Sequence, residues 1–189
     1  MPQPNTTERI LDTAEHLVQT RGFNGFSYAD IANSLKLTKA SLHYHFPAKA
    51  ELGRSLIIRY EQNFAAALAT VDRLGKDARD KLHRYAAIYA GVLREDRMCL
   101  CGMLAAEYAT LPKAMQKELR HFFEENERWL ESVLQAGRAA GELDFAGSAD
   151  ELAMLFVGSL EGAMMLARTG GGVRRFRVSA ERLIEELCA

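Results

Sequence analysis

Residues 38–47, TKASLHYHFP, are the segment of this chain whose side chains most invite a chemical role. Two histidines flank a tyrosine just after a lysine, so the segment could hold a metal ion, take part in catalysis or contact a nucleic acid. On a helix, His43 and His45 would point about 200° apart, which excludes a shared metal ion. The sequence fixes no nucleophile or carboxylate beside them for catalysis. Whether the segment instead contacts a nucleic acid depends on the elements on either side of it, and we expect no catalytic residue, metal site or cofactor.

The elements around this segment predict a helix-turn-helix motif over about residues 27–46. Ser27 and Asp30 form a capping pair that begins a short helix ending near residue 35 or 36. Thr38 is the next N-cap candidate, so another short helix is expected over about residues 39–44. The turn between the two helices is about three residues long, and two short helices joined by so tight a turn are typical of the helix-turn-helix.

The rest of the chain is predicted to be helical as well, with roughly nine helices in all and no sheet. A first helix between Asn5 and Gly22 precedes the motif, and a long helix follows it from about Pro47. Further helices are expected at about 77–95, 98–109, 112–139, 149–168 and 178–188. The fold class is thus all-α, with a three-helix N-terminal domain over residues 5–50 and a larger C-terminal helical domain over residues 51–189.

A helix-turn-helix reads DNA by placing the N-terminal end of its second helix in the major groove. Small polar residues at that end let the backbone approach the bases. Lys39 can contact phosphate or guanine, and Ala40 can touch a thymine methyl group. The predicted DNA-contacting residues are Ser27, Thr38, Lys39, Ala40, Ser41, His43, Tyr44, His45 and Lys49.

Residues 8–52, ERILDTAEHLVQTRGFNGFSYADIANSLKLTKASLHYHFPAKAEL, resemble the TetR/AcrR family of transcriptional repressors. The helix–Gly–Phe run, the Ile31-Ala32 pair and the Tyr-His-Phe-x-x-Lys ending at residues 44–49 all fall in register. The resemblance implies a homodimer on a palindromic operator of double-stranded DNA, released by a small-molecule inducer bound in the C-terminal domain.

This chain departs from the pattern of that family at three places. Lys36 stands where the family usually has glycine, and a left-handed lysine costs about 1 kcal/mol. His43 stands where tyrosine is common, which predicts a weaker, pH-dependent phosphate contact. The glutamate that usually follows the lysine is displaced to Glu51, after Ala50.

Two glycines at spacing four, Gly158 and Gly162, indicate close packing of two helices. Packing within one chain would explain them, but we favour a four-helix bundle across a two-fold axis, because a single helix-turn-helix binds DNA poorly. The predicted dimer-interface residues are Leu155, Gly158, Gly162, Leu183 and Leu187.

Aromatic and thioether side chains in the C-terminal part could form ordinary core or line an adaptable apolar pocket. The predicted pocket residues are Met103, Tyr108, Phe122, Phe123, Trp129 and Phe156. Cys99 and Cys101 leave a second hypothesis open, a thiol-based sensor of oxidants or electrophiles on the same scaffold. Their C-x-C spacing on one helix does not favour a disulfide, so buried apolar thiols are the preferred interpretation.

Composition limits the remaining classes of protein. The 24 Lys and Arg residues against 25 Asp and Glu give a net charge of −1, so binding to DNA would require a local basic patch on the protein surface. The N-terminus does not have the pattern of a signal peptide and no long apolar run occurs, so we expect a cytoplasmic protein with no membrane partner. The motifs G-x-S-x-G and H-E-x-x-H and phosphate loops do not occur, which makes a helical enzyme the least favoured alternative.

Overall fold

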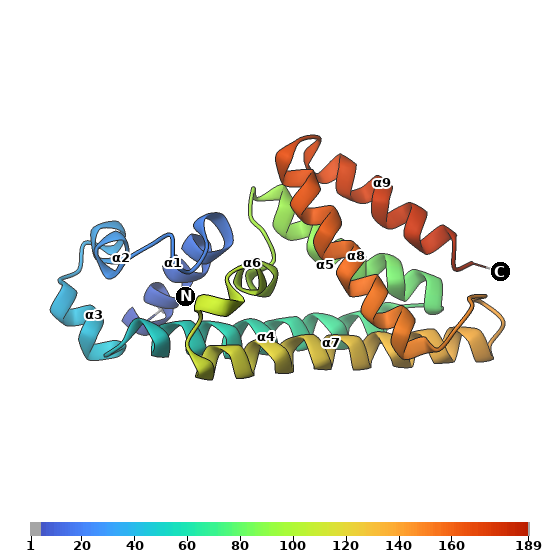
Figure 1. Cartoon of the computed structure of the whole chain (residues 1–189), viewed down its shortest axis with the longest axis horizontal. Coiled ribbons are helices and arrows are strands. Elements are labelled where there is room, and N and C mark those ends of the chain that lie inside the picture. The colour runs from blue at the N-terminus through green and yellow to red at the C-terminus, as the bar shows by residue number, and fades with distance from the viewer. Residues whose placement is uncertain (1–4, 189) are drawn as a thin grey trace. The chain divides into compact units, whose positions relative to one another are not determined.

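The computed structural model describes residues 5–188, which form nine α-helices and one short 3₁₀ helix (Figure 1). The only β pairing among these residues is an isolated bridge between Leu143 and Cys188. The predicted all-α fold is therefore confirmed. The elements are α1 (Thr6–Arg21), α2 (Tyr28–Leu35), α3 (Lys39–His45), α4 (Lys49–Leu74), α5 (Ala78–Arg94), α6 (Leu100–Ala106), η1 (Tyr108–Thr110), α7 (Lys113–Ala139), α8 (Ala149–Thr169) and α9 (Gly172–Glu185).

The chain divides into two compact units. The first contains the residues up to Gln62 together with 99–122, and the second contains residues 63–98 and those from Phe123 onward. The N-terminal unit thus extends past the predicted boundary at residue 50 and includes α6, η1 and the start of α7. The division into a DNA-binding domain over 5–50 and a ligand-binding domain over 51–189 stays a prediction about function.

The first unit is built around the three-helix motif. Leu42 and Phe46 are buried, as expected for side chains that fix α3 against α1 and α2. The hydroxyl of Tyr28, also buried, donates a hydrogen bond to the backbone oxygen of Phe46 at 2.7 Å. This bond ties the start of α2 to the end of α3, so that the two helices of the motif hold a fixed angle.

An ion-pair cluster joins α4 to α1 within the same unit. The guanidinium of Arg59 lies 2.7 Å from Glu15 and 2.8 Å from Asp12, and one of its nitrogens also reaches Glu8 at 3.2 Å. Three carboxylates on one face of α1 therefore share one partly buried cation. Because hydrogen-bonded Arg–carboxylate pairs of this kind are geometrically specific, the cluster fixes the position of α1 along α4.

Aromatic rings form the centre of the second unit. The rings of Tyr85 and Trp129 stack with centroids 5.4 Å apart, and Phe156 lies 6.1 Å from Tyr85. The hydroxyl of Tyr85 donates to the side-chain oxygen of Asn126 at 3.2 Å and lies 3.1 Å from the hydroxyl of Tyr89. The core of this unit thus contains a small polar group of residues surrounded by aromatic rings.

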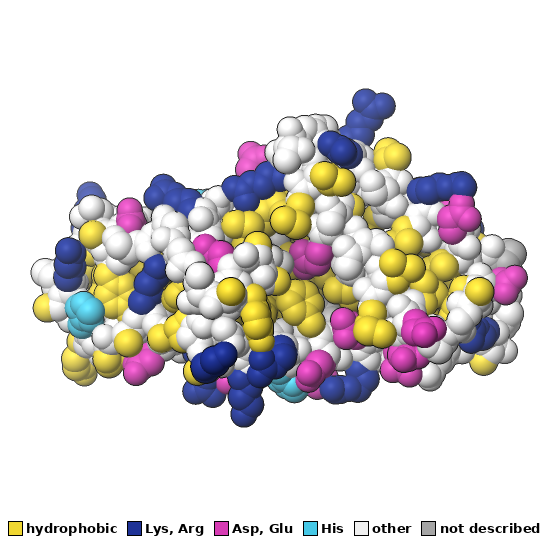
Figure 2. Space-filling view, in the orientation of Figure 1, with side chains coloured by type: hydrophobic (Ala, Val, Ile, Leu, Met, Phe, Trp, Pro, Cys, Tyr) yellow, Lys and Arg dark blue, Asp and Glu magenta, His cyan; other side chains and the backbone are white. Residues whose placement is uncertain are grey.

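Helix α8 is apolar on two faces. One face packs into the second unit, while four large hydrophobic side chains on the other are at least half exposed (Figure 2). These are Met154, Leu155, Met165 and Leu166. By length and composition alone α8 could cross a membrane, but the core helices of soluble proteins pass the same test, so this is weak support for a membrane span.

Helix α9 starts earlier than the sequence predicted. The expected range was 178–188, with the glycines at 170–172 in a loop that ends the preceding helix. The helix instead begins at Gly172 and ends at Glu185, with Phe176, Ala180 and Ile184 forming its buried stripe. Gly171, in the left-handed conformation, is its N-cap, so the glycines make a tight turn directly into the helix.

Candidate DNA-binding site

The turn between α2 and α3 keeps the geometry that a glycine would give, although it contains a lysine. Lys36 has φ 55° and ψ 41°, the left-handed conformation, and its N–H points back to Ala32 and Asn33 at the end of α2. The family-typical turn shape is therefore retained at a cost of about 1 kcal/mol. Since its side chain is exposed, Lys36 adds a cation beside the recognition helix.

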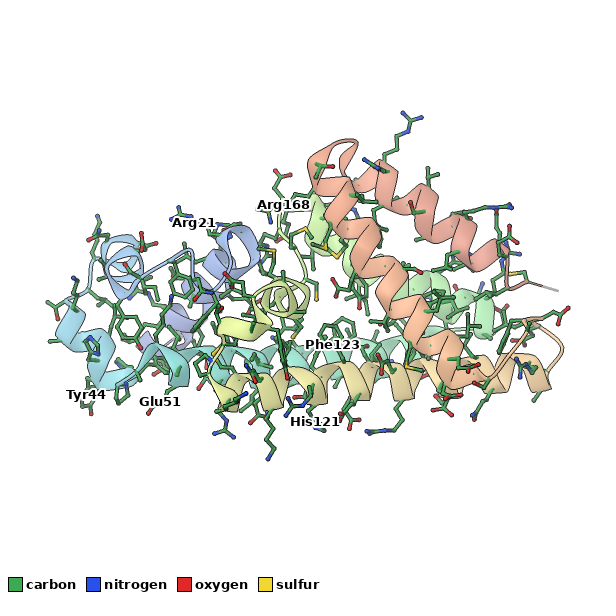
Figure 3. The ribbon with its side chains drawn as sticks, viewed as in Figure 1. Arg21, Tyr44, Glu51, His121, Phe123 and Arg168 are labelled. Atoms are coloured by element: carbon green, nitrogen blue, oxygen red, sulfur yellow. The ribbon has the colours of Figure 1, made fainter. Side chains whose placement is uncertain are left out.

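Helix α3 presents its start and its outer face to solvent. Thr38 is the predicted N-cap, and its hydroxyl oxygen accepts from the N–H of Ser41 at 3.1 Å. Lys39 and Ala40 are exposed, and Tyr44 is 84% exposed (Figure 3). The cation of Lys39, the small side chain of Ala40 and the hydroxyl-bearing ring of Tyr44 are thus all accessible on this face of α3.

The two histidines make separate contacts, as their spacing predicted. Nδ1 of His43 lies 3.1 Å from the carbonyl oxygen of Pro47, and Nδ1 of His45 lies 3.0 Å from the hydroxyl of Thr7. Because a carbonyl only accepts, Nδ1 of His43 carries the proton, and its Nε2 can donate to a phosphate only when the ring is protonated. His45 instead holds the end of α3 against α1.

Ser27 and Lys49, two further predicted DNA-contacting residues, are also engaged within the protein. The hydroxyl of Ser27 donates to Asp30 at 2.7 Å, as part of the predicted capping box of α2. The ammonium of Lys49 donates to the carbonyl oxygens of Phe23 and Phe26, each at 2.5 Å. The structure thus gives the ammonium of Lys49 two partners in the loop after α1, and its contact with a phosphate stays a prediction.

The loop after α1 brings in a residue that sequence reasoning missed. The carboxylate of Glu107, at the end of α6, accepts hydrogen bonds from the backbone N–H groups of Phe23 at 2.6 Å and of Asn24 at 3.1 Å. Burial lowers the pKa of Lys49, and the charges of Glu107 and Asp30 oppose that shift. Glu107 is 84 residues from Phe23 in sequence, so no local pattern could have predicted this contact.

Charge around α3 is locally positive although the chain carries a net charge of −1. Residues 36–49 contain three lysines and two histidines, without a single aspartate or glutamate. The carboxylates of α1 are meanwhile paired with Arg59. A basic surface on an otherwise balanced chain is the pattern expected of a protein that binds the phosphate backbone through one face.

The predicted pocket residues are divided between the two units. Met103, Tyr108 and Phe122 belong to the first unit, and Phe123, Trp129 and Phe156 to the second. Phe156 is fully buried, and the indole N–H of Trp129 donates to Asp72 at 2.9 Å.

Cys99 and Cys101 are both buried. The sulfur of Cys99 lies 3.6 Å from the hydroxyl of Tyr60, which donates to it. Burial of this kind agrees with the preferred interpretation of these thiols as small core side chains and gives the thiol-sensor hypothesis no added support.

The predicted dimer-interface residues differ in exposure. Leu155 is 61% exposed and Gly158 is exposed, whereas Leu187 is buried within its own unit. A Cβ added at Gly158 or Gly162 would meet no atom within 4 Å. Contacts inside the chain therefore do not require a glycine at either position, and the dimer interface stays a prediction.

We expect the buried hydroxyl of Tyr28, which donates to the backbone oxygen of Phe46, to make the free energy of unfolding decrease at alkaline pH. Burial, aided by the charge of Glu51, raises the pKa of Tyr28 to about 12. The pKa of Tyr28 in the folded protein thus lies above its value of about 10 in the unfolded chain. The neutral hydroxyl therefore contributes its full stabilisation of the fold below pH 10, and this contribution is lost as pH rises through about 12. Between pH 10 and pH 12, the free energy of unfolding measured in urea should fall by about 2 kcal/mol more for wild type than for Tyr28→Phe.

At neutral pH the Tyr28→Phe variant should itself be about 1–2 kcal/mol less stable, since the oxygen of Phe46 loses its donor. All other titrating groups are shared, so they cancel in the comparison. A stability difference between the two proteins that stays constant from pH 8 to pH 12 would contradict the role given to this hydroxyl.

Two models of one protein family match most of the chain. Residues 10–56 match "Bacterial regulatory proteins, tetR family", and residues 78–182 match "Tetracyclin repressor-like, C-terminal domain". The first match contains all of α2 and α3, and the second extends from the start of α5 into α9. The helices that carry the exposed basic face are thus those that the N-terminal model describes.

Known proteins of the same kind align over most of their length. The transcriptional regulator AcuR of Cereibacter sphaeroides is 31% identical over 159 residues, covering 82% of this chain and 72% of that protein. A TetR family regulator from Agrobacterium tumefaciens is 32% identical, with a TM-score of 0.93 over 97% of each chain. A regulator from Saccharomonospora viridis, solved in complex with choline, is 25% identical, with a TM-score of 0.83 over 97% of each chain. The chain therefore belongs to the TetR family of bacterial transcriptional regulators and binds DNA through its helix-turn-helix.

Proposed function

We propose that the chain is a homodimeric repressor that binds a palindromic operator and is released when a small molecule binds its C-terminal domain. The observation that carries this proposal is the surface of α3, where Lys39, Ala40 and Tyr44 are exposed within a segment of three lysines and no carboxylate. Such a helix suits the major groove, with its start on the bases and its later residues near phosphates. The family model for the C-terminal part, described as tetracyclin repressor-like, supports repression.

Dimerisation is supported by the exposed apolar face of α8. Leu155 and Leu166 are each more than half exposed, and Gly158 and Gly162 between them leave room for another helix to approach closely. A two-fold axis would place this face against its own copy, since a symmetric interface uses the same surface twice. Two recognition helices held about 34–36 Å apart would then meet successive major grooves.

Ligand binding is supported by the aromatic core of the second unit. The side-chain nitrogen of Asn126 is buried, and it has no hydrogen-bond partner among residues 5–188. Buried polar atoms of this kind are normally satisfied by an ordered water or a ligand. The hydroxyl of Tyr85 donates to the side-chain oxygen of Asn126, and the rings of Tyr85 and Trp129 stack 5.4 Å apart, so this nitrogen lies close to aromatic groups. The choline complex of the Saccharomonospora viridis regulator is a precedent for small-molecule binding on this fold.

Selection of genomic fragments by the purified chain would test the proposed function. We expect enriched fragments to share an inverted repeat whose half-sites lie about 10 base pairs apart, or a multiple of that distance. The logarithm of the binding constant should fall linearly with the logarithm of salt concentration. Enriched fragments without a repeat, or binding that does not respond to salt, would refute the proposal. Native mass spectrometry of the protein as purified would show whether a small molecule is retained.

A further inference from the structure

The loop of residues 22–26, between α1 and α2, is held by hydrogen bonds from two other parts of the first unit. From the start of α4, the ammonium of Lys49 reaches the carbonyl oxygens of Phe23 and Phe26 and lies 4.5 Å and 4.2 Å from the centres of their rings. The carbonyl side of the loop is thus bound to a cation. Because α2 begins directly after Ser27, the position of this loop sets where the helix-turn-helix starts.

The amide side of the same loop is bound to an anion. One carboxylate oxygen of Glu107 lies 2.6 Å from the N–H of Phe23, and the other lies 3.1 Å from that of Asn24. Two N–H groups pointing at one carboxylate are charge-assisted donors, which makes the pair stronger than neutral hydrogen bonds. Asn24 adds a second tether, since its side-chain nitrogen donates to the hydroxyl of Thr110 at 2.8 Å.

The backbone at Gly22 is shaped to admit this carboxylate. Gly22 has φ 83°, a conformation that favours glycine, and a Cβ placed there would lie 2.8 Å from a carboxylate oxygen of Glu107. A side chain at residue 22 would therefore displace Glu107 from the amides. The glycine that ends α1 thus also makes room for a residue 85 positions later in the sequence.

We propose that Glu107 is a positioning residue for DNA binding, which fixes the loop of residues 22–26 through the amides of Phe23 and Asn24 and thereby sets the orientation of α2 and α3. The proposal rests on the DNA-binding function argued above. Glu107 does not act by touching DNA, because a carboxylate beside a phosphate is repelled. It acts through the loop, as the anionic half of a clasp whose cationic half is Lys49.

The sign of the expected effect separates positioning from simple electrostatics. Replacing a glutamate by glutamine removes a negative charge, which on its own strengthens binding to a polyanion. Glu107→Gln keeps the shape of the side chain but replaces one accepting oxygen with an NH₂ group that opposes a backbone N–H. We therefore expect Glu107→Gln to bind operator DNA more weakly than wild type, by between about 3-fold and about 30-fold.

Glu118→Gln is the matched control. Glu118 pairs with Arg54 at 2.8 Å in the same unit, and the substitution changes the net charge by the same amount without touching the loop. It should bind operator as tightly as wild type or slightly more tightly. Hydrogen exchange in the absence of DNA should be faster at the amides of Phe23 and Asn24 in Glu107→Gln than in Glu118→Gln.

Each outcome bears directly on the proposal. Wild-type affinity in folded Glu107→Gln, or unchanged exchange at Phe23 and Asn24, would overturn the positioning role while leaving the DNA-binding function intact. Failure of wild type to bind any operator would overturn both. If Glu107→Gln does not fold, Thr110→Val at an exposed residue is the second test. It removes the tether to Asn24 and the hydrogen bond that the Thr110 hydroxyl donates to the backbone oxygen of Glu107, but it keeps the carboxylate of Glu107. It should weaken operator binding by about 2-fold to 5-fold, and equal binding would refute the role of the clasp.

Discussion

A Gly158→Gln variant is expected to be a folded monomer that has lost most of its affinity for the operator. In the single chain a Cβ at Gly158 meets nothing within 4 Å, so the new side chain fits without disturbing its own core. Glutamine is also a better helix former than glycine by about 0.5–1 kcal/mol, so α8 itself should gain stability. Any loss of affinity must then come from a second molecule on this face.

The size of the loss follows from symmetry. Overpacking a close helix contact costs about 1–3 kcal/mol per added side chain, and a two-fold interface contains the change twice. The resulting 2–6 kcal/mol or so corresponds to dimerisation weakened by between about 30-fold and about 10,000-fold. A monomer holds only one half-site, so it also loses the high effective concentration that the second recognition helix enjoys in the dimer.

Sedimentation velocity and operator titration on the same samples would measure both effects. Gly91→Gln is the control, because Gly91 is another helical glycine of the second unit with open space at its Cβ. It should remain dimeric and bind operator as wild type does. A dimeric Gly158→Gln variant with full affinity would show that α8 does not form the interface.

Local signals in the sequence predicted the N-terminal helices well because each boundary there depends on neighbouring residues. Asn5 accepts from the N–H of Glu8 at the start of α1, and Thr38, the predicted N-cap of α3, accepts from that of Ser41. Gly22 ends α1 with a positive φ. Lys36 also agrees with a locally determined boundary, because the turn takes the left-handed conformation even with a lysine at this position.

The parts that sequence reasoning missed depend on contacts between distant residues. In the sequence, Lys49 is only a lysine in the first turn of a helix. The fold shows that its ammonium donates to two carbonyl oxygens of a distant loop. Glu107 reads as one more surface carboxylate at the end of a helix. The error at α9 has a local cause, because three consecutive glycines were read as a break, whereas Gly172 already belongs to the helix.

Replacing Lys39 by alanine is expected to weaken operator binding by between about 30-fold and about 10,000-fold. Each phosphate or guanine contact is worth about 1–3 kcal/mol, and a palindromic complex contains this residue twice. Lys39 is exposed in the first turn of α3, so its removal should leave the fold and the dimer unchanged. Tyr44→Ala removes the most exposed ring of the helix and should also weaken binding without loss of stability.

The salt dependence of the variant identifies what Lys39 contacts. If Lys39 binds phosphate, the steepness of log affinity against log salt should fall by about 2 for the dimer, one unit for each contact removed. The affinity for every DNA sequence should then decrease by the same factor. If Lys39 reads guanine, discrimination at one base position in each half-site should relax. Lys117→Ala, an exposed lysine of α7, loses the same charge away from α3 and should bind nearly as wild type does. Lys39→Ala and Tyr44→Ala proteins that both keep wild-type affinity would leave α3 without a role in recognition, because between them they remove the exposed cation and the exposed ring of its outer face.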